Sequence, residues 1–191
     1  MVAQPRPPSG KTAIELRVTL LELEPTIWRR LQVPGDVRLS RLHSILQAAM
    51  GWEDRHLHNF EIAGESYESL DEDDDEDGEA EDEDSVILSD VVEAGASFSY
   101  LYDFGDSWIH EIVVESVGPV PQALKVAVCL DGQRACPPED CGGVHGFKGF
   151  LEAIGDPDHD EHHEYLNWVG GSYDGAYFDL AAVNAALRRV R

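Results

Sequence analysis

The sequence predicts a single α+β domain: a mainly antiparallel sheet followed by a helical C-terminal third. Residues from Ser97 to Val114 alternate aromatic or β-branched with polar side chains around a turn, which is typical of a β-hairpin. Apolar residues recur at helical spacing over 39–50 and again in the last third. The length of 191 residues is that of one compact domain, so we expect residues 1–191 to fold together.

Two strands open the chain, over 13–23 and 27–33, and each ends near a proline. The second carries Arg29 and Arg30, which we expect to be solvated or ion-paired at a strand edge rather than to form an anion site. The apolar face of 39–50 predicts a helix that stops at Gly51. The later expected elements are strands over 56–62 and 123–130, a short strand and helical turn over 86–92, and helices over 147–154, 158–169 and 180–190.

The charge is distributed unevenly. The formal net charge is −24, and 12 of the 14 residues over 71–84 are acidic, so the remaining residues carry −12. A block of like charges repels itself and buries little apolar surface, so we expect a disordered acidic loop over 70–85 and a flexible leader over 1–11. As a functional element the run would recruit a basic partner, mimic nucleic-acid charge or loosely hold divalent cations; as a structural one it is a solubilising loop. The acidic body argues against direct binding of duplex DNA.

Composition also bears on location. No stretch of 18 apolar residues is present and the first residues have no apolar signal region, so neither a membrane span nor secretion is predicted. The chain has three cysteines. An odd number in a chain without an export signal favours free thiols or metal ligands, and hence the cytoplasm.

Five polar residues are candidates for one cluster. His56 and His58 are two apart on a predicted strand and should point the same way. Asp103 and His110 flank the hairpin turn, which contains Asp106. With a loop of two or four residues, Asp103 would lie diagonal to His110 and within side-chain reach. An orienting pair at a catalytic site and a hydrogen bond that pins the hairpin both explain this spacing.

A Pro- and Gly-rich loop contains the pattern Cys129-x6-Cys136-x4-Cys141-x3-His145. Cysteine and histidine bind zinc, so these four residues are candidate ligands, although only Cys136 and Cys141 approach the spacing of a zinc knuckle. The alternative is buried, inert cysteines in a rigid loop.

A second histidine pattern lies further along the chain. His159 and His163 would lie one turn apart on a helix, as in a metalloprotease motif, but the acid between them is one methylene too short for that role. We expect Asp156 to cap that helix instead.

Six unusual segments occur in order along nearly the whole chain. They are TIWRRLQVPGD (26–36), LHSILQAAMGW (42–52), HLHNFEI (56–62), YDFGDSWIHEI (102–112), CLDGQRACPPEDCGG (129–143) and AIGDPDH (153–159). With these segments the chain resembles the plasmid pRiA4b ORF-3-like family. The resemblance implies one α+β domain of no established activity, and family members often lie near mobile elements, where some are labelled TnpR resolvase. The residues do not support a recombinase, because the chain is acidic and lacks a serine or tyrosine recombinase's catalytic set.

Two hypotheses for function follow. The first is a non-enzymatic cytoplasmic accessory module whose acidic surface binds a basic protein partner. The second is a zinc-binding protein or metal-dependent enzyme that uses the cysteine loop with His56, His58 or His110.

Overall fold

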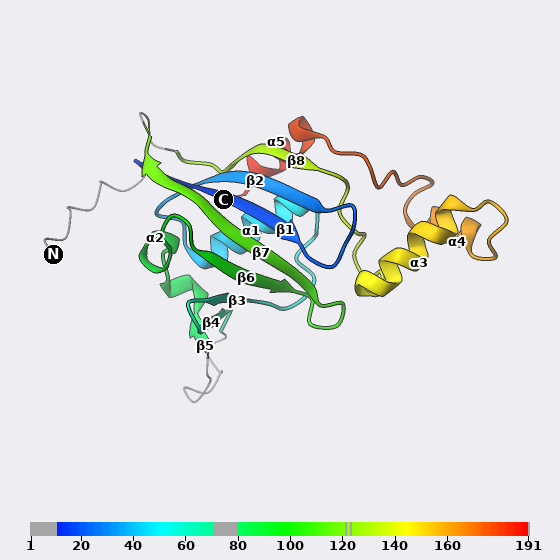
Figure 1. The fold of residues 1–191 in the computed structure, drawn as a ribbon, viewed down its shortest axis with the longest axis horizontal. Coiled ribbons are helices and arrows are strands. Elements are labelled where there is room, and N and C mark those ends of the chain that lie inside the picture. The colour runs from blue at the N-terminus through cyan, green and yellow to red at the C-terminus, as the bar shows by residue number, and fades with distance from the viewer. Residues whose placement is uncertain (1–10, 71–79, 121, 123, 191) are drawn as a thin grey trace, which may run out of the picture.

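The computed structural model describes residues 11–70, 80–120, 122 and 124–190. An eight-stranded sheet, with the strand order β5-β4-β3-β6-β7-β1-β2-β8, forms the body of the molecule (Figure 1). All neighbouring strands are antiparallel except β4 and β5. The elements are β1 (Thr12–Leu20), β2 (Ile27–Pro34), α1 (Leu39–Met50), β3 (His58–Ile62), β4 (Glu65–Glu68), β5 (Ala80–Asp82), the 3₁₀ turn η1 (Glu83–Ser85), α2 (Leu88–Val91), β6 (Ser97–Tyr102), β7 (Trp108–Pro119), β8 (Val128–Gln133), α3 (Gly143–Gly155), α4 (His162–Trp168) and α5 (Leu180–Leu187).

The α+β class and the mainly antiparallel sheet are confirmed. The predicted helix over 39–50 coincides with α1, and Gly51 ends it with a left-handed φ of 90°. The predicted hairpin is the pair β6 and β7, with Tyr102 opposite Trp108.

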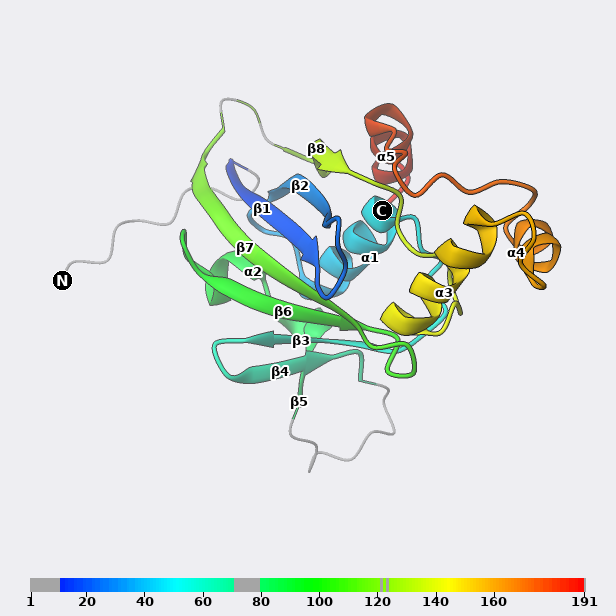
Figure 2. The ribbon, with the colours of Figure 1, turned by 45° about the vertical axis from the view of Figure 1, so that its right-hand side comes forward.

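Helices cover one face of the sheet. Figure 2 shows α1 running along that face, α5 beside β8, and α3 with α4 beyond one end of the strands. Tyr100 and His110 are fully buried under α1, and Tyr100 bonds with two of its side chains. The opposite face is solvated: there the Arg17 guanidinium lies 4.1 Å from the Trp28 ring centroid. This one-sided burial explains the alternation of the strand sequences.

The acid run is partly structured, which corrects the expectation of a disordered loop over 70–85. Residues 71–79 lie outside the described residues, but Ala80–Asp82 pair with β4 and Glu83 is buried. Glu83 accepts a 2.9 Å hydrogen bond from His58 Nε2, so this acid is part of the core. The leader over 1–10 also lies outside the described residues.

Arg29 corrects a second expectation. Its side chain is neither solvated nor ion-paired within the described residues: it is 3% exposed, and it donates to the carbonyls of Ala49, Trp28, Gln133 and Arg134. Arg30 does form the expected ion pairs, with Glu15 and Glu115.

Helix α4 begins later than expected, at His162. Asp156 therefore caps only a turn, where its Oδ1 accepts from the Asp158 amide, and it does not cap a helix. His159 lies in the same turn, so the proposed i, i+4 pair with His163 does not share a helix face.

Within the described ranges, no helix is both long and apolar enough to cross a bilayer. The cytoplasmic location stays a prediction.

Candidate functional site

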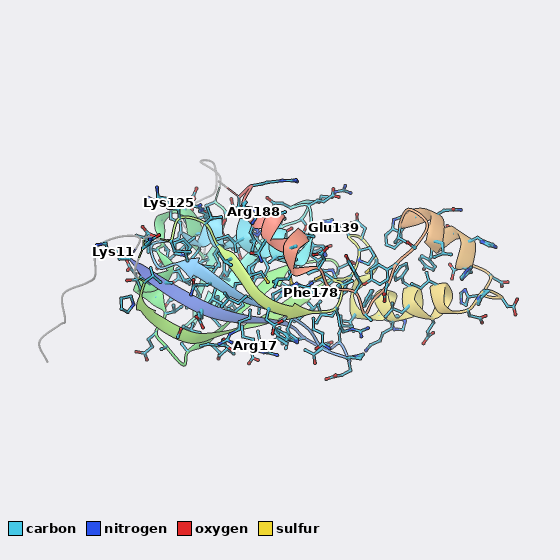
Figure 3. All side chains as sticks on the ribbon, turned by 90° about the horizontal axis from the view of Figure 1, so that it is seen from above. Lys11, Arg17, Lys125, Glu139, Phe178 and Arg188 are labelled. Atoms are coloured by element: carbon cyan, nitrogen blue, oxygen red, sulfur yellow. The ribbon has the colours of Figure 1, made fainter. Side chains whose placement is uncertain are left out.

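Three loops meet at the end of the sheet nearest α3. They are the α1–β3 connection (51–57), the β6–β7 loop (103–107) and the segment after β8 (134–142). Trp52 Nε1 donates to the Pro137 carbonyl at 3.0 Å, and the Gly142 amide donates to Asp106 Oδ2 at 3.0 Å. Figure 3 places Glu139 at this junction, between the sheet and the protruding helices.

Asp103 organises the β6–β7 loop. It is 7% exposed and has a left-handed φ of 58°. Its Oδ1 accepts from the amides of Gly105 at 2.9 Å and Asp106 at 3.2 Å. Because β6 ends at Tyr102 and β7 begins at Trp108, the loop has five residues, not the two or four considered above. Asp103 bonds within this loop and does not pair with His110. Its second oxygen, Oδ2, lies 3.5 Å from His56 Nε2.

His56 lies before β3, between two carboxylates. Its Nε2 is 2.9 Å from Asp140 Oδ1 as well as 3.5 Å from Asp103 Oδ2. Although both oxygens are close, this nitrogen is buried and has no hydrogen-bond partner in the described part of the chain. The carboxylates thus lie close to Nε2 but outside the geometry of a hydrogen bond.

An acid–phenol pair, Glu139 and Tyr102, lies beside these residues. The Tyr102 hydroxyl donates to Glu139 Oε1 at 3.0 Å and accepts from the Arg55 amide at 3.0 Å. Burial raises the pKa of Tyr102 above its ordinary value, so the phenol stays protonated as a donor. Glu139 also accepts from the Glu53 amide at 2.7 Å, which ties the α1–β3 connection to the cysteine loop.

A pocket of about 420 Å³ opens beside this junction. Its aromatic lining includes Trp168, which is 45% exposed, and Tyr173. Its charged lining residues are Glu53, Arg55, Glu139 and Asp140. Because Arg55 is already paired with Glu53, the pocket has a net negative lining.

The structure divides the predicted polar cluster in two. His56, Asp103 and Asp106 lie at the loop junction, whereas His58 and His110 lie in the core. His58 stacks on His43 with ring centroids 3.5 Å apart. His110 Nδ1 lies 3.2 Å from the Tyr100 carbonyl oxygen, and burial lowers the pKa of His110 to about 4. His110 Nε2, like His56 Nε2, is buried without a hydrogen-bond partner among the described residues, but it belongs to no group of three donor atoms close enough for an ion.

The predicted zinc ligands are not brought together. The one group of three or more His, Cys, Asp and Glu donor atoms close enough for an ion, in the ranges that the structure covers, is His56, Asp103 and Asp140. Cys136 instead accepts from Arg29 Nη2 at 3.1 Å, and His145 is exposed on α3. Burial raises the pKa of Cys136 to about 11 and that of Cys141 to about 12, so both are neutral thiols at pH 7.

Asp140 and Glu139 are not among the residues predicted for the site. Both lie in the Pro- and Gly-rich loop, where the sequence pattern pointed to the cysteines instead. The adjacent acids in CPPEDC were the available signal, and their partners lie too far away in sequence to be recognised from spacing.

Comparisons with known proteins agree with this fold. The chain is 42% identical to the "Uncharacterized protein y4hQ" of Sinorhizobium fredii, over 92% of this chain and 91% of that protein. It is similar to the crystal structure of the protein of unknown function MM3350 from Methanosarcina mazei Go1, with a TM-score of 0.81 and 33% identity over 89% of this chain and 96% of that one. The family model described as plasmid pRiA4b ORF-3-like protein matches residues 12–182, and the chain therefore belongs to this family.

Proposed function

We propose that this protein is a binding module that takes a lysine or arginine side chain of a protein partner into the pocket beside Glu139. The observation that carries the proposal is the lining of that pocket, where carboxylates outnumber the one paired arginine and two aromatic rings form the wall. Carboxylates attract a cationic side chain, and an aromatic face adds a cation–π contact.

The partly exposed Trp168 is the natural anchor for such a ligand. Its ring lies edge-on to Phe150, with centroids 5.7 Å apart, so the indole is held in place while much of it remains accessible. Glu139 is held by Tyr102 and by the Glu53 amide, so its charge is fixed at the pocket wall. The body charge of −12 outside the acid run would steer a basic partner toward this surface. Association with mobile elements stays a prediction of the family resemblance.

Calorimetric titration with an acetylated and amidated tetralysine peptide tests the proposal. We expect binding that weakens with salt and that Trp168→Ala and Glu139→Gln each weaken by about 3- to 10-fold, as expected for a lost cation–π contact or ion pair. Glu111→Gln is the matched control: it removes one charge from the exposed side of β7, away from the pocket, and should leave the affinity within about twofold.

Both pocket variants retain the whole acid run. If tetralysine binds them as tightly as it binds the unaltered protein, the acid run alone accounts for the binding and the pocket has no part in it. That result would overturn the proposal.

A further inference from the structure

We infer that His56, Asp103 and Asp140 form a binding site for a divalent first-row transition-metal ion, with Zn²⁺ as the representative. One donor atom of each residue lies within 4.8 Å of the other two. Two atoms that bind one ion at about 2.1 Å lie about 3.0 to 3.4 Å apart. The separations of 2.9 and 3.5 Å from His56 Nε2 to the two carboxylates closely match that range.

The ligands are held in position before any ion binds. Two backbone amides donate hydrogen bonds to Asp103 Oδ1, and this leaves Oδ2 directed at His56. Metal-binding carboxylates are commonly oriented by hydrogen bonds of this kind. His56 Nε2 is enclosed and lacks a hydrogen-bond partner within the described residues, which is costly for a buried polar atom unless a ligand satisfies it.

Charge favours a cation here. Two carboxylates, one of them buried, face a single imidazole, so the group remains negative even with the histidine protonated. A divalent ion would offset both charges. One nitrogen and two oxygen donors suit zinc and its neighbours, and three protein ligands leave a position for water, as in catalytic zinc sites.

The inference goes beyond the proposed function and is tested without any peptide. Tag-free protein is stripped with EDTA, dialysed and titrated with Zn²⁺ by calorimetry, beside His56→Ala and Asp140→Asn. Asp140 is 56% exposed, so its replacement should leave the fold intact, which circular dichroism verifies. We expect one tight site per chain, weakened at least about 100-fold in both variants. At a hundredfold excess over Kd, Zn²⁺ should raise the Tm by about 5 to 10 °C in the unaltered protein alone.

The matched control is the double variant His159→Ala/His163→Ala, which removes exposed histidines from the α4 region. It should keep the tight site. Loss of that site in the control, or its retention in both His56→Ala and Asp140→Asn, would overturn the inference. Co²⁺ loading adds a spectroscopic readout: an intense thiolate charge-transfer band would assign the ion to the cysteines and also refute it, whereas weak bands alone agree with nitrogen and oxygen donors.

Discussion

Replacing the buried Arg29 should destabilise the protein more than any surface charge change. All five of its N–H groups are used: Nε donates to the Ala49 carbonyl at 3.0 Å, and Nη1 and Nη2 donate to three further carbonyls and the Cys136 sulfur. Ala49 lies in the last turn of α1, where carbonyls lack helical partners and a cation is favourable. The same guanidinium holds residues 133–136, which lead into the loop that carries Glu139 and Asp140.

The magnitude follows from the bonds that are lost. Arg29→Met preserves much of the side-chain volume but leaves four carbonyls without this donor, at about 1 kcal/mol for each. We therefore expect a loss of about 3 to 5 kcal/mol in the free energy of unfolding, which for a domain of this size lowers the Tm by about 10 °C. Urea unfolding followed by tryptophan fluorescence and circular dichroism measures the loss.

The neighbouring arginine provides the control. Arg30 has a 43% exposed side chain and forms surface ion pairs, so Arg30→Met should cost at most about 1 kcal/mol. Equal stabilities for the Arg29 and Arg30 variants would refute the assignment of Arg29 as the link between α1, β2 and the loop after β8.

Two further predictions concern the loop junction and the core. Gly143→Ala should destabilise the protein and separate the β6–β7 loop from the cysteine loop, because φ is 65° and a Cβ there would lie 2.4 Å from the Asp106 carbonyl oxygen. Gly149→Ala, where a Cβ meets no atom of the described residues within 4 Å, should instead be neutral or stabilising by up to about 1 kcal/mol; similar melting temperatures for the two variants would contradict the close approach. For His110, burial lowers the pKa from 6.5 to about 4, so between these values the unfolded chain binds a proton that the folded protein does not. Stability should thus fall by about 3 kcal/mol as pH drops from 6.5 to 4, and His110→Gln should abolish that part of the slope in urea titrations at stepped pH; an unchanged slope would show that His110 is not the group responsible.

The sequence predicted the elements whose periodicity reports burial on one face. The helix over 39–50 and the hairpin of β6 and β7 were recognisable because their apolar residues repeat at 3.6 or 2 residues, and that repeat records which face meets the core. The short strands β4 and β5 were not predicted. They have only four and three residues, and β5 lies within the acid run, whose charge indicated disorder. The charge of the acid run also predicted disorder at Glu83. In the structure this side chain is ordered because it accepts a hydrogen bond from His58.

The fold class, the family and the three segments that form the loop junction could therefore be predicted from the sequence alone. Which of their side chains meet depends on the tertiary structure. His56 lies beside Asp103 and Asp140, His58 and His110 lie in the interior, and the cysteines belong to no group of three donor atoms close enough for an ion among the described residues. This is because the periodicity of a segment reports only which face of that helix or strand is buried. A site depends also on loop lengths, such as the five residues between β6 and β7, and on contacts between segments tens of residues apart, such as the hydrogen bonds from Arg29 to α1 and to the loop after β8.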